Sequence, residues 1–260
     1  MSKVDWEEES KRFNATAAYY DLYRPSYPKE LIHCIEKKSN IGLDSKILEI
    51  GAGSGKASEL FLNRGYNLVC IEPSPQLAEM GMNKHKDKKV EFVVTRFENW
   101  MEPNHYFDMV FSAQAFHWVP KPIGYTKCAN SLKTHGYLAL FWNMYLSEIE
   151  PQYKELISLC INYDVFPFHS LEEINNRINN ITIEISNCEH FAPPSVHRFP
   201  WNQQYNIEGF IGFLKTGSGF LALPESDQTK LIHEATTIML KHGGRLTLKF
   251  ISTLFLAKKR

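Results

Sequence analysis

One short stretch of the chain sets an acidic residue and three glycines at alternate positions, Glu49-x-Gly51-x-Gly53-x-Gly55. Apolar residues that favour β-structure precede the glycines, and a helical pattern follows them. This order is typical of a buried parallel strand that turns into a helix, with a ligand-facing loop between the two. Glycine allows the sharp turn and lets a ligand approach backbone atoms that a Cβ would shield. The stretch therefore predicts a ligand-binding loop.

The spacing of this loop disfavours two phosphate-binding motifs. A P-loop requires Gly-x-x-x-x-Gly-Lys-Ser/Thr, but Ile50 occupies the first glycine position and Ala57 the hydroxyl position. A dinucleotide fingerprint, Gly-x-Gly-x-x-Gly, requires a third glycine where Lys56 stands. The remaining pattern resembles the first motif of the class I S-adenosylmethionine-dependent methyltransferases, and an acid at the strand end suits the cationic sulfonium and ammonium of that cofactor. The resemblance implies cofactor contacts at Glu49, Gly51, Ala52, Gly53 and Gly55.

The ends of the next two predicted strands are expected to complete the cofactor site. The strand at 67–72 ends in an acid about 20 residues beyond the glycines, where dinucleotide folds hydrogen-bond the ribose hydroxyls. After the strand at 90–94, Phe97 is placed to cover one face of the adenine and Glu98 to accept from its amine. Packing of Phe97 in the core is the alternative. The predicted cofactor contacts at these two strand ends are Glu72, Pro73, Arg96, Phe97 and Glu98.

The loop after the fourth predicted strand, 107–112, is expected to lie closest to the transferred methyl. The Asn/Asp-Pro-Pro-Tyr/Phe motif of amino-methylating DNA enzymes would fall here, but the chain reads Ser-Ala-Gln-Ala at 112–115, which counts against a nucleobase substrate. The predicted contacts are Ser112 and Ala113 for the cofactor, Gln114 and His117 for catalysis, and Trp118 for the substrate. A structural histidine in the first turn of the next helix is the alternative for His117.

Longer motifs extend the resemblance to one family. The segments Phe-Asp-Met-Val-x-Ser-Ala-Gln-Ala-Phe-His-Trp-Val at 107–119 and Arg-Phe-Glu-Asn-Trp at 96–100 resemble the bacterial methyltransferases of the type 11, or trans-aconitate-like, family. Tyr20-x-x-x-Arg24-Pro25-x-Tyr27-Pro28 matches the N-terminal segment of that family. We expect Tyr20 and Arg24 to belong to a lid over the cofactor, with Arg24 facing its carboxylate. A helix that packs on the sheet edge is the alternative.

Alternating strands and helices predict a Rossmann-like, doubly wound α/β fold. We expect a seven-stranded, mostly parallel sheet with helices on both faces, an antiparallel last strand and a small helical cap. The predicted parts are an N-terminal helical lid (1–40), the S-adenosylmethionine-binding core (41–142) and a remainder (143–260) that completes the sheet and carries the cap (143–180 and 206–242). Candidate substrate contacts in this remainder are Asn143, Tyr145, Thr216 and Ser218. Helix-end capping is the alternative for the last two.

The amino-acid composition limits the kinds of partner that the chain is expected to bind. The 260 residues suit one large α/β domain with an insertion, and Lys plus Arg equals Asp plus Glu at 29 each, so no net charge favours nucleic acid or an anionic membrane. The five cysteines are scattered without a C-x-x-C pair, and the histidines show no metal-ligand spacing, so we expect neither disulfides nor a metal. No signal peptide or membrane-length apolar run is visible, which favours the cytoplasm.

These patterns predict methyl transfer from S-adenosylmethionine to a small-molecule acceptor. A carboxylate acceptor needs no base, whereas a hydroxyl needs one, and His117 is the nearest candidate. A nicotinamide-dependent oxidoreductase is the alternative enzyme, since it shares the strand, the glycine turn and Glu72. A non-catalytic S-adenosylmethionine-binding protein is the alternative outside enzymes. The sequence fits a monomer and a homodimer equally.

Overall fold

A computed structural model describes residues 21–101, 103–166 and 168–260 of the chain. The chain divides into two compact units. We call them the sheet unit, formed by 26–143, 175–199 and 252–260, and the helical unit, formed by 144–174, 200–251 and the described residues up to Pro25.

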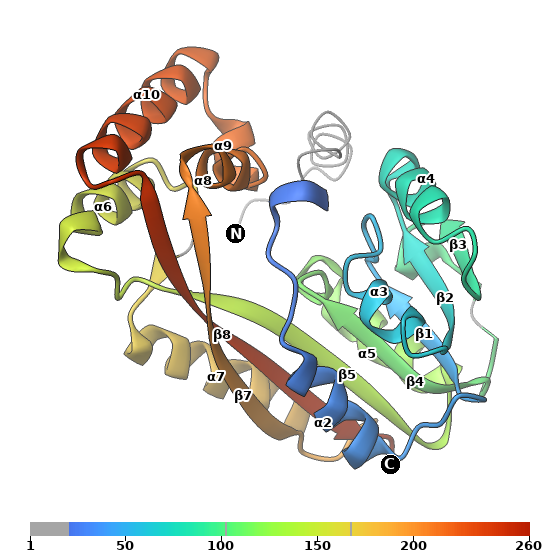
Figure 1. The fold of residues 1–260 in the computed structure, drawn as a ribbon. Coiled ribbons are helices and arrows are strands. Elements are labelled where there is room, and N and C mark those ends of the chain that lie inside the picture. The colour runs from blue at the N-terminus through green and yellow to red at the C-terminus, as the bar shows by residue number, and fades with distance from the viewer. Residues whose placement is uncertain (1–20, 102, 167) are drawn as a thin grey trace. The chain divides into compact units, whose positions relative to one another are not determined.

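The central sheet has the strand order β3-β2-β1-β4-β5-β8-β7, and the short strand β6 pairs with β5 outside this path (Figure 1). The strands are β1 (Lys46–Ile50), β2 (Asn67–Glu72), β3 (Val90–Val94), β4 (Phe107–Ala113), β5 (Leu132–Leu146), β6 (Phe168–His169), β7 (Ser195–Asn206) and β8 (Arg245–Lys258). Strands β1 to β6 pair in parallel, as β3–β2, β2–β1, β1–β4, β4–β5 and β5–β6. Strand β8 runs opposite to β5 and β7 (Figure 1). The predicted Rossmann-like fold class is therefore confirmed.

The helices lie before β1 or between two strands along the chain, with three in succession between β7 and β8. They are α2 (Lys29–Ser39), α3 (Ser58–Leu62), α4 (Pro75–Lys84) and α5 (Lys121–Ser131) in the sheet unit, α6 (Lys154–Asn162), α8 (Ile207–Leu214), α9 (Ser218–Ala222) and α10 (Glu225–Lys241) in the helical unit, and α7 (Leu171–Ser186), which has residues in both. None of these described helices combines the length and the apolar character needed to cross a membrane.

The main core of the sheet unit lies between α2, α3 and the strands. Leu31, Ile32 and Ile35 recur at helical spacing on α2 and are fully buried in this core. On α3, Phe61 stacks on Phe111 of β4 with ring centroids 4.5 Å apart. This packing supports β1 and β4, whose carboxyl ends lead into the glycine loop and into the loop that carries His117.

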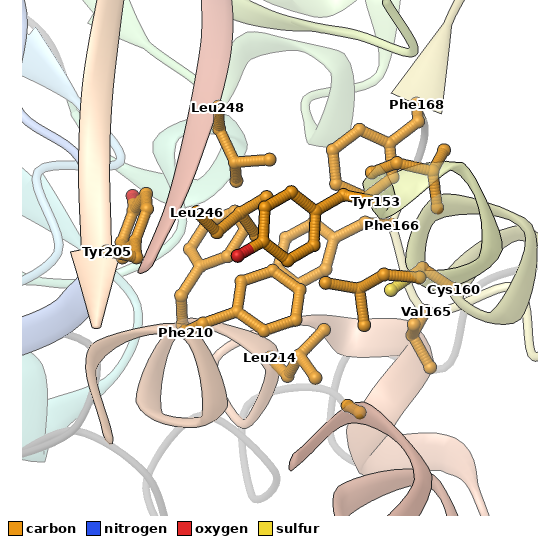
Figure 2. Close-up of a cluster of buried hydrophobic side chains, with 14 of the residues drawn as sticks. Tyr153, Cys160, Val165, Phe166, Phe168, Tyr205, Phe210, Leu214, Leu246 and Leu248 are labelled. Atoms are coloured by element: carbon orange, nitrogen blue, oxygen red, sulfur yellow. The ribbon is translucent and has the colours of Figure 1, made fainter. Parts of the chain in front are cut away.

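The helical unit has its own aromatic core. Figure 2 shows side chains from the α6 region, α8 and β8 that point toward one another, among them Tyr153, Phe210 and Leu246. The Tyr153 hydroxyl lies 2.8 Å from the carbonyl oxygen of His242, so this polar group is satisfied inside the apolar cluster. Helices α6, α8 and α10 fall within 143–180 and 206–242, the segments in which the sequence predicts a helical cap.

Two element boundaries differ from the predictions. The sequence predicts a turn at 134–136 before a strand at 137–142, but β5 runs continuously from Leu132 to Leu146. The interruption is local, because His135 has φ +67° and the β4–β5 register shifts nearby before pairing resumes. The helix predicted to start at Lys56 starts at Ser58, because the N–H of Leu60 donates to the carbonyl oxygen of Ala57, three residues back, so the residues before Ser58 form turns.

Candidate cofactor and active site

The glycine loop between β1 and α3 is held against its neighbours by its backbone. Gly51, Gly53 and Gly55 have φ values of +70°, +58° and +80°, a region that residues with a Cβ seldom adopt. The N–H of Gly51 donates to the carbonyl oxygen of Ile71 at 2.8 Å, which ties the loop to β2. A Cβ at Gly51 would lie 2.4 Å from the Cβ of Ala115, so glycine is required there for two reasons.

Glu72, the predicted ribose acid at the end of β2, is buried beside this loop. Its Oε2 accepts from the N–H of Gly53 at 2.7 Å, and its Oε1 accepts from the N–H of Ser74 at 2.9 Å. Burial raises the pKa of Glu72 to about 7, and the two backbone hydrogen bonds partly oppose this rise. Each carboxylate oxygen keeps a lone pair that can accept from a ligand hydroxyl.

Glu49, at the end of β1, is fully enclosed by protein. The Ser58 hydroxyl and the Cys70 thiol both donate to its Oε2, the thiol at 3.7 Å. Its Oε1 is buried and accepts no hydrogen bond from the described residues. Burial raises the pKa of Glu49 to about 8, the hydrogen bonds from Ser58 and Cys70 oppose the rise, and the charge of Glu72 adds to it. The buried carboxyl is therefore largely protonated at pH 7 in the ligand-free protein, and a cation placed beside it would favour its ionised form.

These buried acids should make the ligand-free protein less stable as pH rises. Between pH 4.5 and about 8, folded Glu49 keeps a proton that the unfolded chain has lost. The free energy of unfolding therefore falls across this window, by up to about 1.4 kcal/mol per pH unit for one group. We expect Glu49→Gln to flatten the fall in melting temperature between pH 5 and 9, whereas Glu79→Gln, at an exposed position of α4, should not. Equal slopes in Glu49→Gln and the unaltered protein would contradict this assignment.

The predicted adenine contacts lie just after β3. Phe97 is buried at 3% exposure, its ring centroid lies 6.2 Å from that of Trp100, and the Lys127 ammonium lies 5.9 Å from the centre of the Phe97 ring. This packing agrees with the alternative of a core position, and a role in covering a base stays a prediction. Arg96 and Glu98 on either side of Phe97 are half-buried.

The loop after β4 contains the candidate catalytic residues. Ser112 is fully buried and donates from its hydroxyl to the carbonyl oxygen of Ile50 at 2.8 Å, so it links the ends of β4 and β1. Ala113 next to it is half-buried. Gln114 has φ +60° and donates from Nε2 to the carbonyl oxygen of Asn143 at 3.2 Å. The loop thus starts from a fixed backbone position beside the glycine loop.

His117 is accessible to solvent and has a defined hydrogen-bond partner. The indole Nε1–H of Trp142 donates to its Nδ1 at 3.3 Å, and the ring of Trp118 lies 4.7 Å from its own. Partial desolvation by neighbouring residues and the positive charge of Arg177 lower the pKa of His117 below its usual value. The imidazole is therefore neutral at pH 7. Because an indole N–H only donates, Nδ1 is the acceptor and Nε2 carries the proton.

The other predicted site residues have structural partners. Asn143 donates from Nδ2 to the carbonyl oxygen of Ser26 at 3.0 Å and accepts at Oδ1 from Ser252 at 2.5 Å, so its amide is satisfied within the sheet unit. Tyr145, Thr216 and Ser218 belong to the helical unit. The Thr216 hydroxyl donates to the carbonyl oxygen of Phe213 at 2.6 Å, as expected for helix-end capping. Ser218 begins α9.

Arg24 also belongs to the helical unit. Its guanidinium donates to the Tyr145 hydroxyl at 3.1 Å and to the carbonyl oxygen of Thr216 at 2.8 Å, and lies 5.3 Å from the ring centre of Phe166. The predicted glycine-loop contacts belong to the sheet unit, so a role for Arg24 at the cofactor carboxylate stays a prediction. Tyr20 lies outside the described residues.

Comparison with known proteins places this site in a family. Residues 48–140 match the model of the methyltransferase domain. An uncharacterized methyltransferase of Mycobacterium tuberculosis is 30% identical over 233 residues, which cover 90% of this chain and 87% of that relative. The chain belongs to the class I S-adenosylmethionine-dependent methyltransferases.

Two solved structures show the same fold. A proposed type II methyltransferase from Anaeromyxobacter dehalogenans has a TM-score of 0.65 at 15% identity, over 90% of this chain and 97% of that one. A Haemonchus contortus phospholethanolamine N-methyltransferase 2, solved with S-adenosylhomocysteine, has a TM-score of 0.52 at 14% identity, over 95% of this chain and 57% of that one. Of the two enzyme classes that the sequence left open, the domain match and the Mycobacterium tuberculosis relative support methyl transfer over nicotinamide oxidoreduction.

The glycine loop of this methyltransferase fits S-adenosylmethionine. The cofactor is cationic at its sulfonium and ammonium, and the buried Oε1 of Glu49 accepts no hydrogen bond from the described residues. Gly51, Gly53 and Gly55 hold the loop backbone at positive φ, and Ala115 and His85 fill the space beside Gly51 and Gly55. Ser58 and Cys70, which set the environment of Glu49, were not predicted from the sequence, because nothing in their spacing marks a contact with β1.

Proposed function

We propose that this methyltransferase acts on a small molecule whose methyl-accepting atom is an oxygen, and that a carboxylate fits its loop after β4 better than a hydroxyl does. The motifs at 96–100 and 107–119 support its membership of the trans-aconitate-like subfamily. The observation that carries the choice of acceptor is the state of His117, which is neutral, accessible and hydrogen-bonded at Nδ1.

The geometry of His117 makes it a hydrogen-bond donor. A base must offer a free lone pair, but Nδ1 accepts from Trp142 and Nε2 carries the proton. A hydroxyl acceptor needs a base, whereas a carboxylate is already ionised at pH 7. The Nε2–H of His117 suits one carboxylate oxygen, and this contact would orient the other oxygen for attack. His117 is thus proposed to orient the acceptor.

The cofactor would be held by Glu49, Glu72 and the backbone of Gly51–Gly55 in this proposal. Bound there, it supplies an electrophilic methyl carbon on a sulfonium, whose thioether leaves without a proton. Transfer of this methyl to an ionised carboxylate oxygen would release the thioether, and the residues of the chain would have no proton to remove. The contribution of the protein is therefore alignment, which can supply roughly 7–11 kcal/mol of the barrier.

We expect His117→Ala to lower kcat about 10- to 100-fold, the loss of one hydrogen bond to a charged group, and to leave the Kd of S-adenosylmethionine within about 2-fold. His117→Gln, which can place an amide N–H near the position of Nε2, should recover part of the rate. Acceptors are first found by screening metabolites for formation of S-adenosylhomocysteine, and kcat is then measured at saturating cofactor. His233→Ala, at an exposed position of α10, is the control.

The pH dependence of kcat separates the two acceptor classes. With a carboxylate and a donating His117, kcat should stay flat between pH 6 and 8. A rise of kcat through this range that His117→Ala removes would assign His117 as a base and favour a hydroxyl. Tight cofactor binding without turnover on any acceptor of the screen would support the non-catalytic alternative.

A further inference from the structure

His85 links α4 to the last glycine of the loop. It directly follows α4, its side chain is 4% exposed, and its backbone N–H donates to the carbonyl oxygen of Gly81 at 3.0 Å. Its Nε2 lies 3.1 Å from the carbonyl oxygen of Gly55. Because a carbonyl oxygen only accepts, Nε2 carries a proton and donates it to this bond.

Gly55 is the point at which the loop becomes a helix. Its carbonyl oxygen also accepts from the N–H of Glu59 at 2.9 Å, in the first turn of α3. Its φ is +80°, and a Cβ there would lie 2.8 Å from the Nε2 and Cδ2 of His85. Glycine at this position therefore admits the imidazole, and the imidazole fixes the direction of the carbonyl group.

The opposite end of α4 is attached to the same site. The N–H of Ser74, the residue that caps α4, donates to Oε1 of Glu72 at 2.9 Å, and the Ser74 hydroxyl accepts from the N–H of Leu77 at 3.2 Å. Helix α4 thus contacts the predicted ribose acid at its start and the glycine loop just past its end. Both connections are hydrogen bonds of buried groups, which are costly to leave unmade.

We propose that His85 is a positioning residue of the S-adenosylmethionine site, which holds Gly55 and the entry to α3 in the cofactor-binding conformation through its Nε2–H. Loss of the donor leaves the Gly55 carbonyl with one partner and lets the loop relax. The inference concerns cofactor binding, so it does not depend on the identity of the acceptor.

Two amide substitutions of His85 test whether the hydrogen-bond donor at the Nε2 position is required. His85→Gln can place an N–H near the position of Nε2, whereas His85→Asn reaches only to the position of Nδ1. We expect calorimetry with S-adenosylmethionine and S-adenosylhomocysteine to give Kd values within about 3-fold of the unaltered protein for His85→Gln, and about 10-fold weaker for His85→Asn, the typical effect of one hydrogen bond. Lys86→Gln, exposed at the next position, is the control.

A purely structural role predicts a different result. It would lower the melting temperature in both amide variants and move their Kd values together, and that outcome would overturn the proposal, as would unchanged Kd values in both. If His85→Asn does not fold, His85→Leu, which keeps apolar volume and has no donor, replaces it in the comparison with His85→Gln. Once a methyl acceptor is identified, the KM for S-adenosylmethionine should rise in the variant that lacks the donor at the Nε2 position, His85→Asn or His85→Leu. The kcat at saturating cofactor should stay constant.

Discussion

Gly51→Ala is expected to weaken S-adenosylmethionine binding by about 10-fold or more, since every 1.4 kcal/mol needed to restore the binding conformation of the loop is a factor of about 10 in Kd. The added Cβ would lie 2.4 Å from the Cβ of Ala115, which is fixed to the backbone and cannot turn aside. The substitution also places a Cβ at φ +70°, at a cost of about 1–2 kcal/mol, and the overlap adds about 1–3 kcal/mol. The loop must move away from Ala115 to relieve it, which displaces the backbone around the cofactor.

Two glycine controls separate the causes of this effect. A Cβ added at Gly42 would have no atom within 4 Å, and neither would a Cβ added at Gly243. The two positions differ in that Gly243 has φ +84°. Gly243→Ala should therefore show the cost of the positive φ alone, and Gly42→Ala neither cost. Calorimetry gives the Kd and thermal unfolding gives the stability of all three. If the Gly51→Ala and Gly243→Ala proteins bind S-adenosylmethionine with the same Kd, the contact with Ala115 does not shape the cofactor site.

The sequence predicts the strands and the glycine loop because their signals are local. An apolar run such as 67–72 forms a strand wherever it is buried, and Gly51 marks a backbone conformation that its own residue type permits. Strand order was then limited by the rules for parallel α/β sheets, and the observed order follows them. The predicted place of Glu72 beside Gly53 rests on the same logic, since two adjacent strand ends meet at one edge.

The details of the site rest on contacts between distant residues. The bond from Trp142 to His117 joins β5 to the loop after β4, and the bond from His85 to Gly55 joins the ends of different helices. No periodicity marks such pairs. The protonation of His117 follows from one of these contacts, so its change from a candidate base to a proposed donor could not be derived from residue types. Arg24 is a similar case, because its partner Tyr145 lies far along the chain.

Glu72→Gln is expected to weaken S-adenosylmethionine binding by about 10- to 100-fold, the range for hydrogen bonds to a charged group. The carboxylate accepts from the N–H groups of Gly53 and Ser74, so an amide would set its NH₂ against one of these donors. The loop and the start of α4 then lose a shared acceptor, and the predicted ribose contact is lost with it. Glu79→Gln, exposed on α4, is the matched control and should bind as the unaltered protein does.

A ligand without ribose hydroxyls distinguishes direct contact from loop support. If Glu72 accepts from the ribose, the unaltered protein should bind S-adenosylhomocysteine more tightly than its 2′,3′-dideoxy analogue, and Glu72→Gln should lose most of that preference. If Glu72 only holds Gly53 and Ser74, the variant should weaken both ligands by the same factor, because the cycle of two proteins and two ligands then shows no coupling. The coupling energy thus measures the ribose contact separately from the support of the loop, and a value near zero would remove Glu72 from the cofactor contacts.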